Sequence, residues 1–162
     1  LQLEDWVPTL MAAAGETDIK QKLLDGHAVG DKTFNVHLDG YNQLPYLTRE
    51  RDERPRREFF AWVDDGSLGA VRVGPFKAHF STQEHEGVDA WFLGQTPRKA
   101  PLIVDLRADP FEMAPENSSH YDDWVVRHMY VIMPLVELVA EHTASYEAYP
   151  PRQESGRFTP KQ

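Results

Sequence analysis

Apolar residues recur at helical spacing near the start of the chain. They are Trp6, Val7, Leu10, Met11 and Ala14. This spacing predicts an amphipathic helix over residues 5–15, with Asp5 capping its first turn and Gly15 ending it. A second, shorter helix is predicted over residues 18–24, and a single helical turn over residues 44–47.

The middle of the chain carries short apolar runs separated by turn residues. The runs expected to form strands lie at residues 59–63, 68–73, 76–80 and 102–106. Asp64-Asp65-Gly66 and Gly74-Pro75 separate the first three runs and favour tight turns, because glycine accepts a positive φ at little cost. This hairpin spacing predicts four antiparallel strands. Before them, Phe34, Val36 and Leu38 alternate with polar residues and predict a short extended segment.

The last third of the chain shows the longest helical pattern. Its apolar face is expected to carry Trp124, His128, Ile132, Leu135, Val139 and Tyr146. Pro134 should kink this helix or replace one of its turns, and Pro150-Pro151 should end it. The predicted fold class is α+β, with a small four-stranded antiparallel sheet packed against a long C-terminal helix and one or two short N-terminal helices.

Composition excludes several classes of protein. The 162 residues suffice for one ordinary domain or two small ones, and they contain no cysteine, which excludes disulfides and thiolate chemistry. Lys and Arg total 17 against 26 Asp and Glu, so the formal net charge of −9 argues against nucleic-acid binding. Acidic residues interrupt the cationic segment at residues 49–57, which is predicted to be a solvated loop. We expect no membrane span, because no stretch approaches ~20 apolar residues.

One cluster has the composition of a binding site. His37, Asp39, Tyr41 and Asn42 surround Gly40, which would let the backbone approach a ligand closely. The alternative is a turn in which Asp39 hydrogen-bonds its own backbone. The sequence has no histidine pair at metal-binding helical spacing, no nucleophile elbow and no phosphate-binding glycine loop.

Several blocks resemble the C-terminal portion of bacterial arylsulfatases, which belong to the alkaline-phosphatase superfamily. These blocks lie at residues 5–15, 30–48, 55–65, 102–112, 121–128 and 149–153. The most specific of them is the run Asp-Gly-Tyr-Asn-Gln-Leu-Pro-Tyr-Leu-Thr at residues 39–48. The resemblance implies that residues 1–50 form the tail of the sulfatase catalytic domain and that residues 51–162 form the C-terminal sulfatase subdomain.

The resemblance also implies a function, sulfuric ester hydrolysis, in which this chain takes part without supplying the chemistry. The family uses a formylglycine made from Cys or Ser in a Cys/Ser-x-Pro-x-Arg motif, beside a Ca²⁺ ion. That motif does not occur in this sequence, so the chain is assigned no catalytic residue, metal ligand or cofactor, and it is expected to be inactive alone. His37, Tyr41 and Asn42 are the candidate residues at the rim of the substrate pocket.

The expected partner is a sulfatase catalytic domain, either in the same polypeptide or as a separate chain. An alternative from another class is a standalone, non-catalytic interaction module derived from a sulfatase lobe, for which self-association is possible because a docking face would be exposed. The resemblance favours a periplasmic over a cytoplasmic location without fixing the compartment. It leaves the identity of the sulfate ester open.

Overall fold

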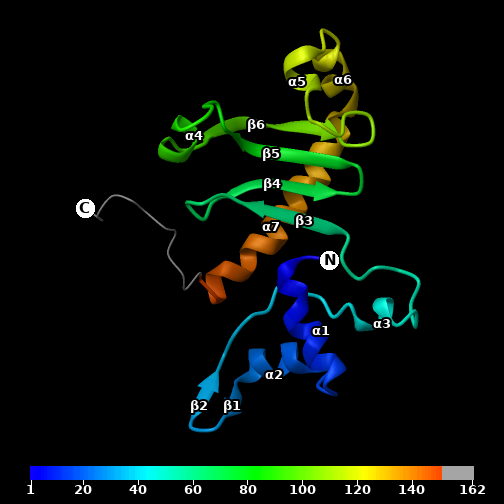
Figure 1. The fold of residues 1–162 in the computed structure, drawn as a ribbon, viewed down its shortest axis with the longest axis vertical. Helices are drawn as coiled ribbons and strands as arrows, with labels where there is room; N and C mark the ends of the chain where they lie inside the picture. The colour runs from blue at the N-terminus through cyan, green and yellow to red at the C-terminus, as the bar shows by residue number, and fades with distance from the viewer. Residues whose placement is uncertain (151–162) are drawn as a thin grey trace. The chain divides into compact units, whose positions relative to one another are not determined.

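The computed structural model describes residues 1–150, which form two compact units (Figure 1). The first unit comprises residues 1–57 together with Glu147–Pro150, and the described part of the second comprises Glu58–Tyr146. The assignment of residues 1–50 to a catalytic domain and of residues 51–162 to a subdomain stays a prediction.

The first unit consists of short elements in chain order. They are η1 (Leu3–Asp5), α1 (Trp6–Ala13), α2 (Ile19–Asp25), β1 (His27–Val29), β2 (Lys32–Phe34) and α3 (Leu44–Leu47). Gly15, with a φ of 94°, follows α1 as expected for a helix end. The predicted extended segment is shorter than expected. The observed strand, Lys32–Phe34, overlaps the predicted segment only at Phe34, and it pairs with His27–Val29 in a hairpin that the sequence pattern did not predict.

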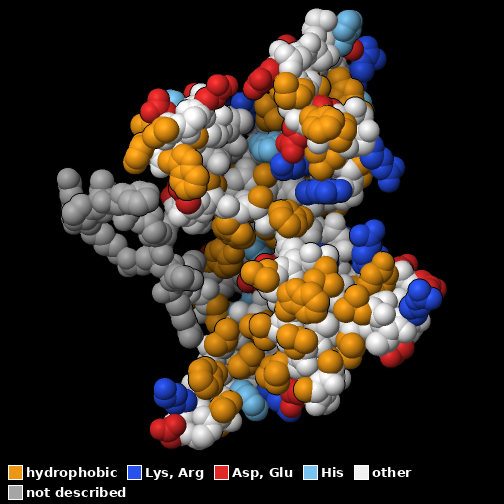
Figure 2. Space-filling view, in the orientation of Figure 1, with side chains coloured by type: hydrophobic (Ala, Val, Ile, Leu, Met, Phe, Trp, Pro, Cys, Tyr) orange, Lys and Arg blue, Asp and Glu red, His pale blue; other side chains and the backbone are white. Residues whose placement is uncertain are grey.

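The helix α1 turns its large apolar side chains outward within the first unit. Thr9 and Ala12 are buried, whereas the larger residues on the other side of η1 and α1 are not. The exposed fractions are 87% for Leu3, 43% for Trp6, 50% for Val7 and 60% for Leu10. We call these four residues the α1 ridge; Figure 2 shows apolar side chains gathered on this side of the first unit.

The second unit is built on a four-stranded antiparallel sheet, as predicted. Its strands, in spatial order, are β3 (Glu58–Trp62), β4 (Leu68–Val73), β5 (Phe76–Thr82) and β6 (Thr96–Asp105). The register aligns Phe60 with Val71, Val71 with Ala78, and Ala78 with Ile103. Because paired residues point to the same face, these four side chains form a continuous apolar row.

The strand β6 is longer than the sequence pattern predicts. It begins at Thr96 instead of Leu102 and includes Pro97 and Pro101. Proline is tolerated in it because β6 is an edge strand, where one side of the backbone needs no ladder hydrogen bond. Before β6 the chain forms the short helix α4 (Asp89–Phe92).

The predicted long C-terminal helix is present in three consecutive segments. They are α6 (Tyr121–His128), the 3₁₀ turn η2 (Met129–Val131) and α7 (Ile132–Ala148), and a short helix α5 (Ala114–Asn117) precedes them. The effect expected of Pro134 is confirmed, because a 3₁₀ turn interrupts the helix and Pro134 falls in the first turn of α7, where no N–H is required.

The helix α7 crosses one face of the sheet and covers the apolar row (Figure 1). Val131 and Leu135 pack against Phe60, Val71, Ala78 and Ile103 to form the buried core. His128 packs against Trp124 with ring centroids 4.3 Å apart, and its Nδ1 lies 2.7 Å from the Trp124 carbonyl oxygen. The predicted α+β class is therefore confirmed.

No helix among residues 1–150 combines the length and the apolar character needed to cross a membrane.

Candidate functional site

The predicted site segment of the first unit is held by a buried aspartate. Asp5 is fully buried, and its Oδ1 accepts a hydrogen bond from the backbone N–H of Tyr41 at 2.9 Å. Its Oδ2 accepts from the backbone N–H of Gln2 at 2.8 Å and from Nε2 of Gln43 at 3.2 Å. The carboxylate makes no capping bond to α1, so the capping role expected of Asp5 is wrong. It joins η1 to residues 41–43 instead.

Arg56 supplies the charge that balances Asp5. Its Nε lies 3.0 Å from Oδ1 and 3.1 Å from Oδ2 of Asp5, and its Nη2 lies 2.6 Å from Oδ1. Nη2 also donates to the carbonyl oxygen of Asp39 at 3.2 Å. Burial disfavours the ionised form of Asp5, but the hydrogen bonds from Arg56, Gln2 and Tyr41 outweigh it and lower the pKa of the carboxyl.

The prediction that residues 49–57 form a solvated loop is therefore wrong for Arg56. The side chain of Arg56 is only 6% exposed, and it also pairs with Glu4 at 2.9 Å. Charge runs are usually solvated, but a buried carboxylate needs a cationic partner, and here the partner comes from this run.

Gly40 is required by the close approach of two backbone segments. A Cβ built at this position would lie 2.0 Å from the carbonyl oxygen of Glu4, a distance that excludes any side chain. Lys20 Nζ donates to the Gly40 carbonyl oxygen at 2.8 Å. The glycine thus serves packing within the first unit, and its role in admitting a ligand stays a prediction.

Tyr41 lies between two cations. The guanidinium carbon of Arg56 is 4.6 Å from the centre of its ring, and Lys20 Nζ is 5.3 Å from it. Such cation–π contacts fix the ring. Burial lowers the pKa of Lys20, and the nearby positive charge of Arg56 adds to this effect while Asp39 and Asp5 oppose it.

The other two predicted site residues lie on the same segment. Asn42 Oδ1 accepts the backbone N–H of Leu44 at 3.0 Å, which is an Asx turn leading into α3. The Asx turn that the alternative interpretation placed at Asp39 stays a prediction, and the bond at Asn42 is an additional turn of the same kind. His37 Nδ1 lies 3.2 Å from Asp39 Oδ1, and the His37 ring lies 5.6 Å from the ring of Tyr149.

These contacts leave a small set of groups that could touch a ligand. The imidazole of His37 is partly exposed, and Nδ2 of Asn42 has no hydrogen-bond partner among residues 1–150. Asp5 and Arg56 are engaged with each other, and their bonds to Tyr41 and Asp39 hold the segment in place. The role of His37, Tyr41 and Asn42 at a substrate rim stays a prediction.

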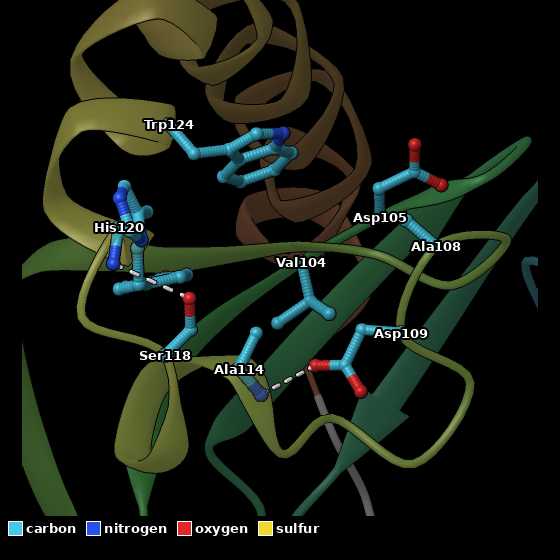
Figure 3. Close-up of a pocket in the computed structure, with 9 residues that line it drawn as sticks. Val104, Asp105, Ala108, Asp109, Ala114, Ser118, His120 and Trp124 are labelled. Carbon is cyan, nitrogen blue, oxygen red and sulfur yellow. Dashed lines mark hydrogen bonds between the residues drawn. The ribbon is translucent and has the colours of Figure 1, made fainter.

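The second unit contains a pocket that the sequence analysis did not predict. It has a volume of about 230 Å³ and lies between the end of β6, the loop that follows it, and α5 and α6 (Figure 3). The lining residues are Val104, Asp105, Ala108, Asp109, Ala114, Ser118, His120, Tyr121 and Trp124. Their positions span 21 residues of sequence and three elements, so no spacing rule marks them as a group.

Hydrogen bonds fix two walls of this pocket. Asp109 accepts the backbone N–H groups of Ala114 at 2.7 Å and Met113 at 3.0 Å, and these bonds lower the pKa of Asp109. The hydroxyl of Tyr121 donates to the Ile103 carbonyl oxygen at 2.8 Å, and burial raises the pKa of Tyr121. The pocket is therefore preformed.

A separate ionic cluster holds the loop between β6 and α5. Glu112, which has a positive φ of 58°, accepts Lys77 Nζ at 2.6 Å and contacts His79 Nε2. Burial lowers the pKa of His79, and the Glu112 carboxylate only partly offsets this. Burial opposes ionisation of Glu112, but its bonds to Lys77 and His79 lower its pKa.

Metal ligands do not gather in the part of the chain that the structure describes. Within residues 1–150, no three His, Asp or Glu side chains are placed so that they could hold a metal ion.

The four-stranded sheet and the helix across it form an α+β lobe. The chain belongs to the family described as the C-terminal region of aryl-sulfatase, which matches residues 54–162. It is 27% identical to an arylsulfatase of Hemicentrotus pulcherrimus over 161 residues, which covers 87% of this chain and 25% of that protein.

A solved structure supports the same fold. The chain is similar to the PsFucS1 sulfatase from Pseudoalteromonas sp., with a TM-score of 0.55 and 22% identity, over 86% of this chain and 27% of that one. The chain thus spans about a quarter of the length of these two relatives. The expected sulfatase C-terminal region is confirmed.

Proposed function

We propose that this chain is the C-terminal portion of a sulfatase, specifically an arylsulfatase, and that it serves sulfuric ester hydrolysis by completing the enzyme's fold and the rim of its substrate pocket. The observation that carries this proposal is the family match over residues 54–162. A bacterial source and a periplasmic location stay predictions.

The chemistry is assigned to a catalytic domain outside this chain. The sequence holds neither a cysteine nor a serine followed by x-Pro-x-Arg, so it offers no precursor of a formylglycine. Within residues 1–150, no three His, Asp or Glu side chains are placed to hold a metal ion, which supports placing the Ca²⁺ site in the catalytic domain. Purified chain supplied with Ca²⁺ should not hydrolyse 4-nitrophenyl sulfate, and clear turnover would overturn this division of labour.

The α1 ridge supports packing of residues 1–50 against the rest of the sulfatase catalytic domain. Four large apolar side chains exposed on one short stretch form the kind of patch that marks an interaction surface. In the complete enzyme, replacing Val7 and Leu10 by serine should destabilise the assembly, because these side chains would lose apolar burial of about 25 cal/mol per Å². The same replacement of Val126 and Met133, exposed residues of the second unit, is the control.

The rim role rests on His37, Tyr41 and Asn42. If they bind the organic part of the substrate in its ground state, alanine at each position of the complete enzyme should raise KM more than it lowers kcat. Lys32→Ala, an exposed change in the same unit, serves as the control. Unchanged kinetics for all three variants would refute the substrate-rim role and leave the interpretation of this segment as a turn.

A second candidate function is a standalone, non-catalytic interaction module. The α1 ridge favours it equally, because a lobe without its catalytic partner would present this surface to another protein or to a second copy. Size-exclusion chromatography distinguishes these two proposed functions only partly. A compact monomer at high concentration argues against self-association through the α1 ridge.

A further inference from the structure

We propose that the pocket of the second unit binds a small phenolic ring, that is, a flat aromatic group carrying a hydroxyl donor. This site is separate from the rim residues of the first unit and does not depend on the sulfatase assignment. It is carried by the size of the pocket, its aromatic wall and the acceptors at its edge.

The size and the walls of the pocket suit one aromatic ring. Val104, Ala114 and Trp124 project into it from three different elements (Figure 3). An apolar cavity of about 150 Å³ is enough to hold benzene, and this pocket measures about 230 Å³.

The aromatic wall is fixed before any ligand enters. The indole of Trp124 stacks on the ring of His128 at an interplanar angle of 20°, and the ring of Tyr121 lies 6.1 Å from it. A flat ring that enters the pocket can pack against this indole in an offset or edge-to-face arrangement, which adds to the energy of burial alone.

The edge of the pocket offers acceptors for a hydroxyl. Asp105 Oδ1 accepts the backbone N–H of Arg107 at 2.9 Å, and the second oxygen of Asp105 has no partner among residues 1–150. His120 lies on the opposite side (Figure 3); its Nδ1 contacts Ser119, and its Nε2 has no partner in the same range. Asp109 cannot serve, because both of its oxygens accept backbone N–H groups.

The charge of the lining selects a neutral donor over an anion. Asp105 and Asp109 place two carboxylates at the pocket and no Lys or Arg side chain lines it. A phenol can donate its proton to Asp105 in a charge-assisted hydrogen bond, whereas an aryl sulfate would bring a negative charge against two others. The proposed ligand class is therefore the phenol and excludes its sulfate ester.

The test is a titration of the ¹⁵N-labelled 162-residue chain with phenol, followed by NMR. The signals of the Trp124 indole and of the Ala114 amide should shift and saturate, with a Kd on the order of 1 mM for so small a ligand. Phenyl sulfate at the same concentrations should leave them in place. Shifts that grow linearly without saturating, or equal shifts with phenyl sulfate, would overturn the proposal.

Two variants locate the binding. Ala114→Leu fills the pocket and should abolish the shift of the Trp124 indole, while Ala144→Leu, an exposed helical site on α7, should leave it unchanged. Asp105→Asn keeps the shape and should weaken phenol binding about tenfold. Wild-type affinity in both pocket variants would contradict the assignment even if one of them were poorly folded.

Two sources of a phenolic ring are distinguished by a second ligand. N-acetyltyrosinamide carries the same ring on a peptide-like backbone. Tighter binding of this compound than of phenol identifies a tyrosine side chain of a protein as the natural occupant, and weaker binding identifies a free phenol. If neither ligand binds, the proposal of a binding site in this pocket is refuted.

Discussion

The two units bury opposite kinds of side chain. At the centre of the first unit lies Asp5, a fully buried carboxylate paired with Arg56, while the α1 ridge remains exposed. At the centre of the second unit lie Ile103 and Val71, also fully buried, beneath α7. One unit is organised around an ion pair and the other around an apolar core.

This difference bears on which unit can fold without the other. Apolar burial drives folding directly, whereas a buried ion pair roughly breaks even after desolvation and mainly fixes one arrangement of its neighbours. We therefore expect the second unit to fold without the first. Both units expose large apolar side chains, among them Leu3 and Leu10 in the first and Trp91 and Phe111 in the second.

The largest effect should come from leaving Asp5 without its partner. Arg56→Met keeps much of the side-chain volume but leaves the buried Asp5 carboxylate without a cationic partner. Such a loss typically lowers the free energy of unfolding by about 3–5 kcal/mol. Amide hydrogen exchange in α1 should therefore accelerate strongly. Arg57→Met, at a 79% exposed side chain paired with Glu53, is the matched control and should change exchange little. Equal effects from both variants would contradict the central role of the ion pair.

The second unit should instead be most sensitive to loss of apolar volume. Leu135, 4% exposed on α7, packs against the core, and Leu135→Ala should cost roughly 2–5 kcal/mol. Denaturant unfolding of the full chain, followed by far-UV circular dichroism, measures it. Met133→Ala, at a 71% exposed site of the same helix, should change the unfolding free energy by less than about 0.5 kcal/mol.

A smaller effect is expected where two backbones touch. Gly40→Ala forces the 39–43 segment away from Glu4 and should destabilise the first unit by about 1–3 kcal/mol, the usual range for overpacking. Exchange protection in residues 1–57 reports it. Gly94→Ala, where a Cβ meets nothing within 4 Å, is the comparison, and a similar loss there would show that the substitution itself is responsible.

The smallest expected effect is the loss of stability at acidic pH, and the two units should lose stability in different pH ranges. The pKa of His79 is lowered from 6.5, so the folded state binds fewer protons than the unfolded state below that pH, and stability of the second unit falls on acidification. Lys77, Glu112 and Arg98 are the charges acting on this ring. The slope should not exceed about 1.4 kcal/mol per pH unit, and His79→Gln should flatten it.

The first unit should respond only at lower pH. Its key carboxyl, Asp5, has a pKa lowered from 3.8, so its contribution is complete above that value and is lost as the pH falls below it. Protection factors of the α1 amides, which correct for the pH dependence of intrinsic exchange, should therefore stay unchanged between pH 7 and pH 5. A loss of α1 protection near pH 6 would contradict this separation.

The sequence predicts the second unit better than the first for the same physical reason. Alternating apolar residues and the turn at Gly66 identify the strands and their hairpins, since sheet and helix formation follow the burial pattern. The start of β6 at Thr96 was missed, because Pro97 and Pro101 are read as breaks unless the strand is known to lie at an edge.

The candidate site was only partly predictable. A local pattern singled out the segment that carries His37, Tyr41 and Asn42, whose site role stays a prediction, but it did not indicate the Asx turn at Asn42. The pairing of Asp5 with Arg56 joins positions 51 residues apart, and nothing local in one sequence reports such a contact. Resemblance to arylsulfatases supplied the family, which periodicity and composition do not specify.

The most direct test of the central claim is to read the coding DNA upstream of the codon for Leu1. If this chain is the C-terminal portion of a sulfatase, the reading frame should stay open and encode a Cys/Ser-x-Pro-x-Arg motif a few hundred codons earlier. A start codon immediately before Leu1, with no sulfatase catalytic domain encoded beside it, would contradict the claim and favour the standalone interaction module.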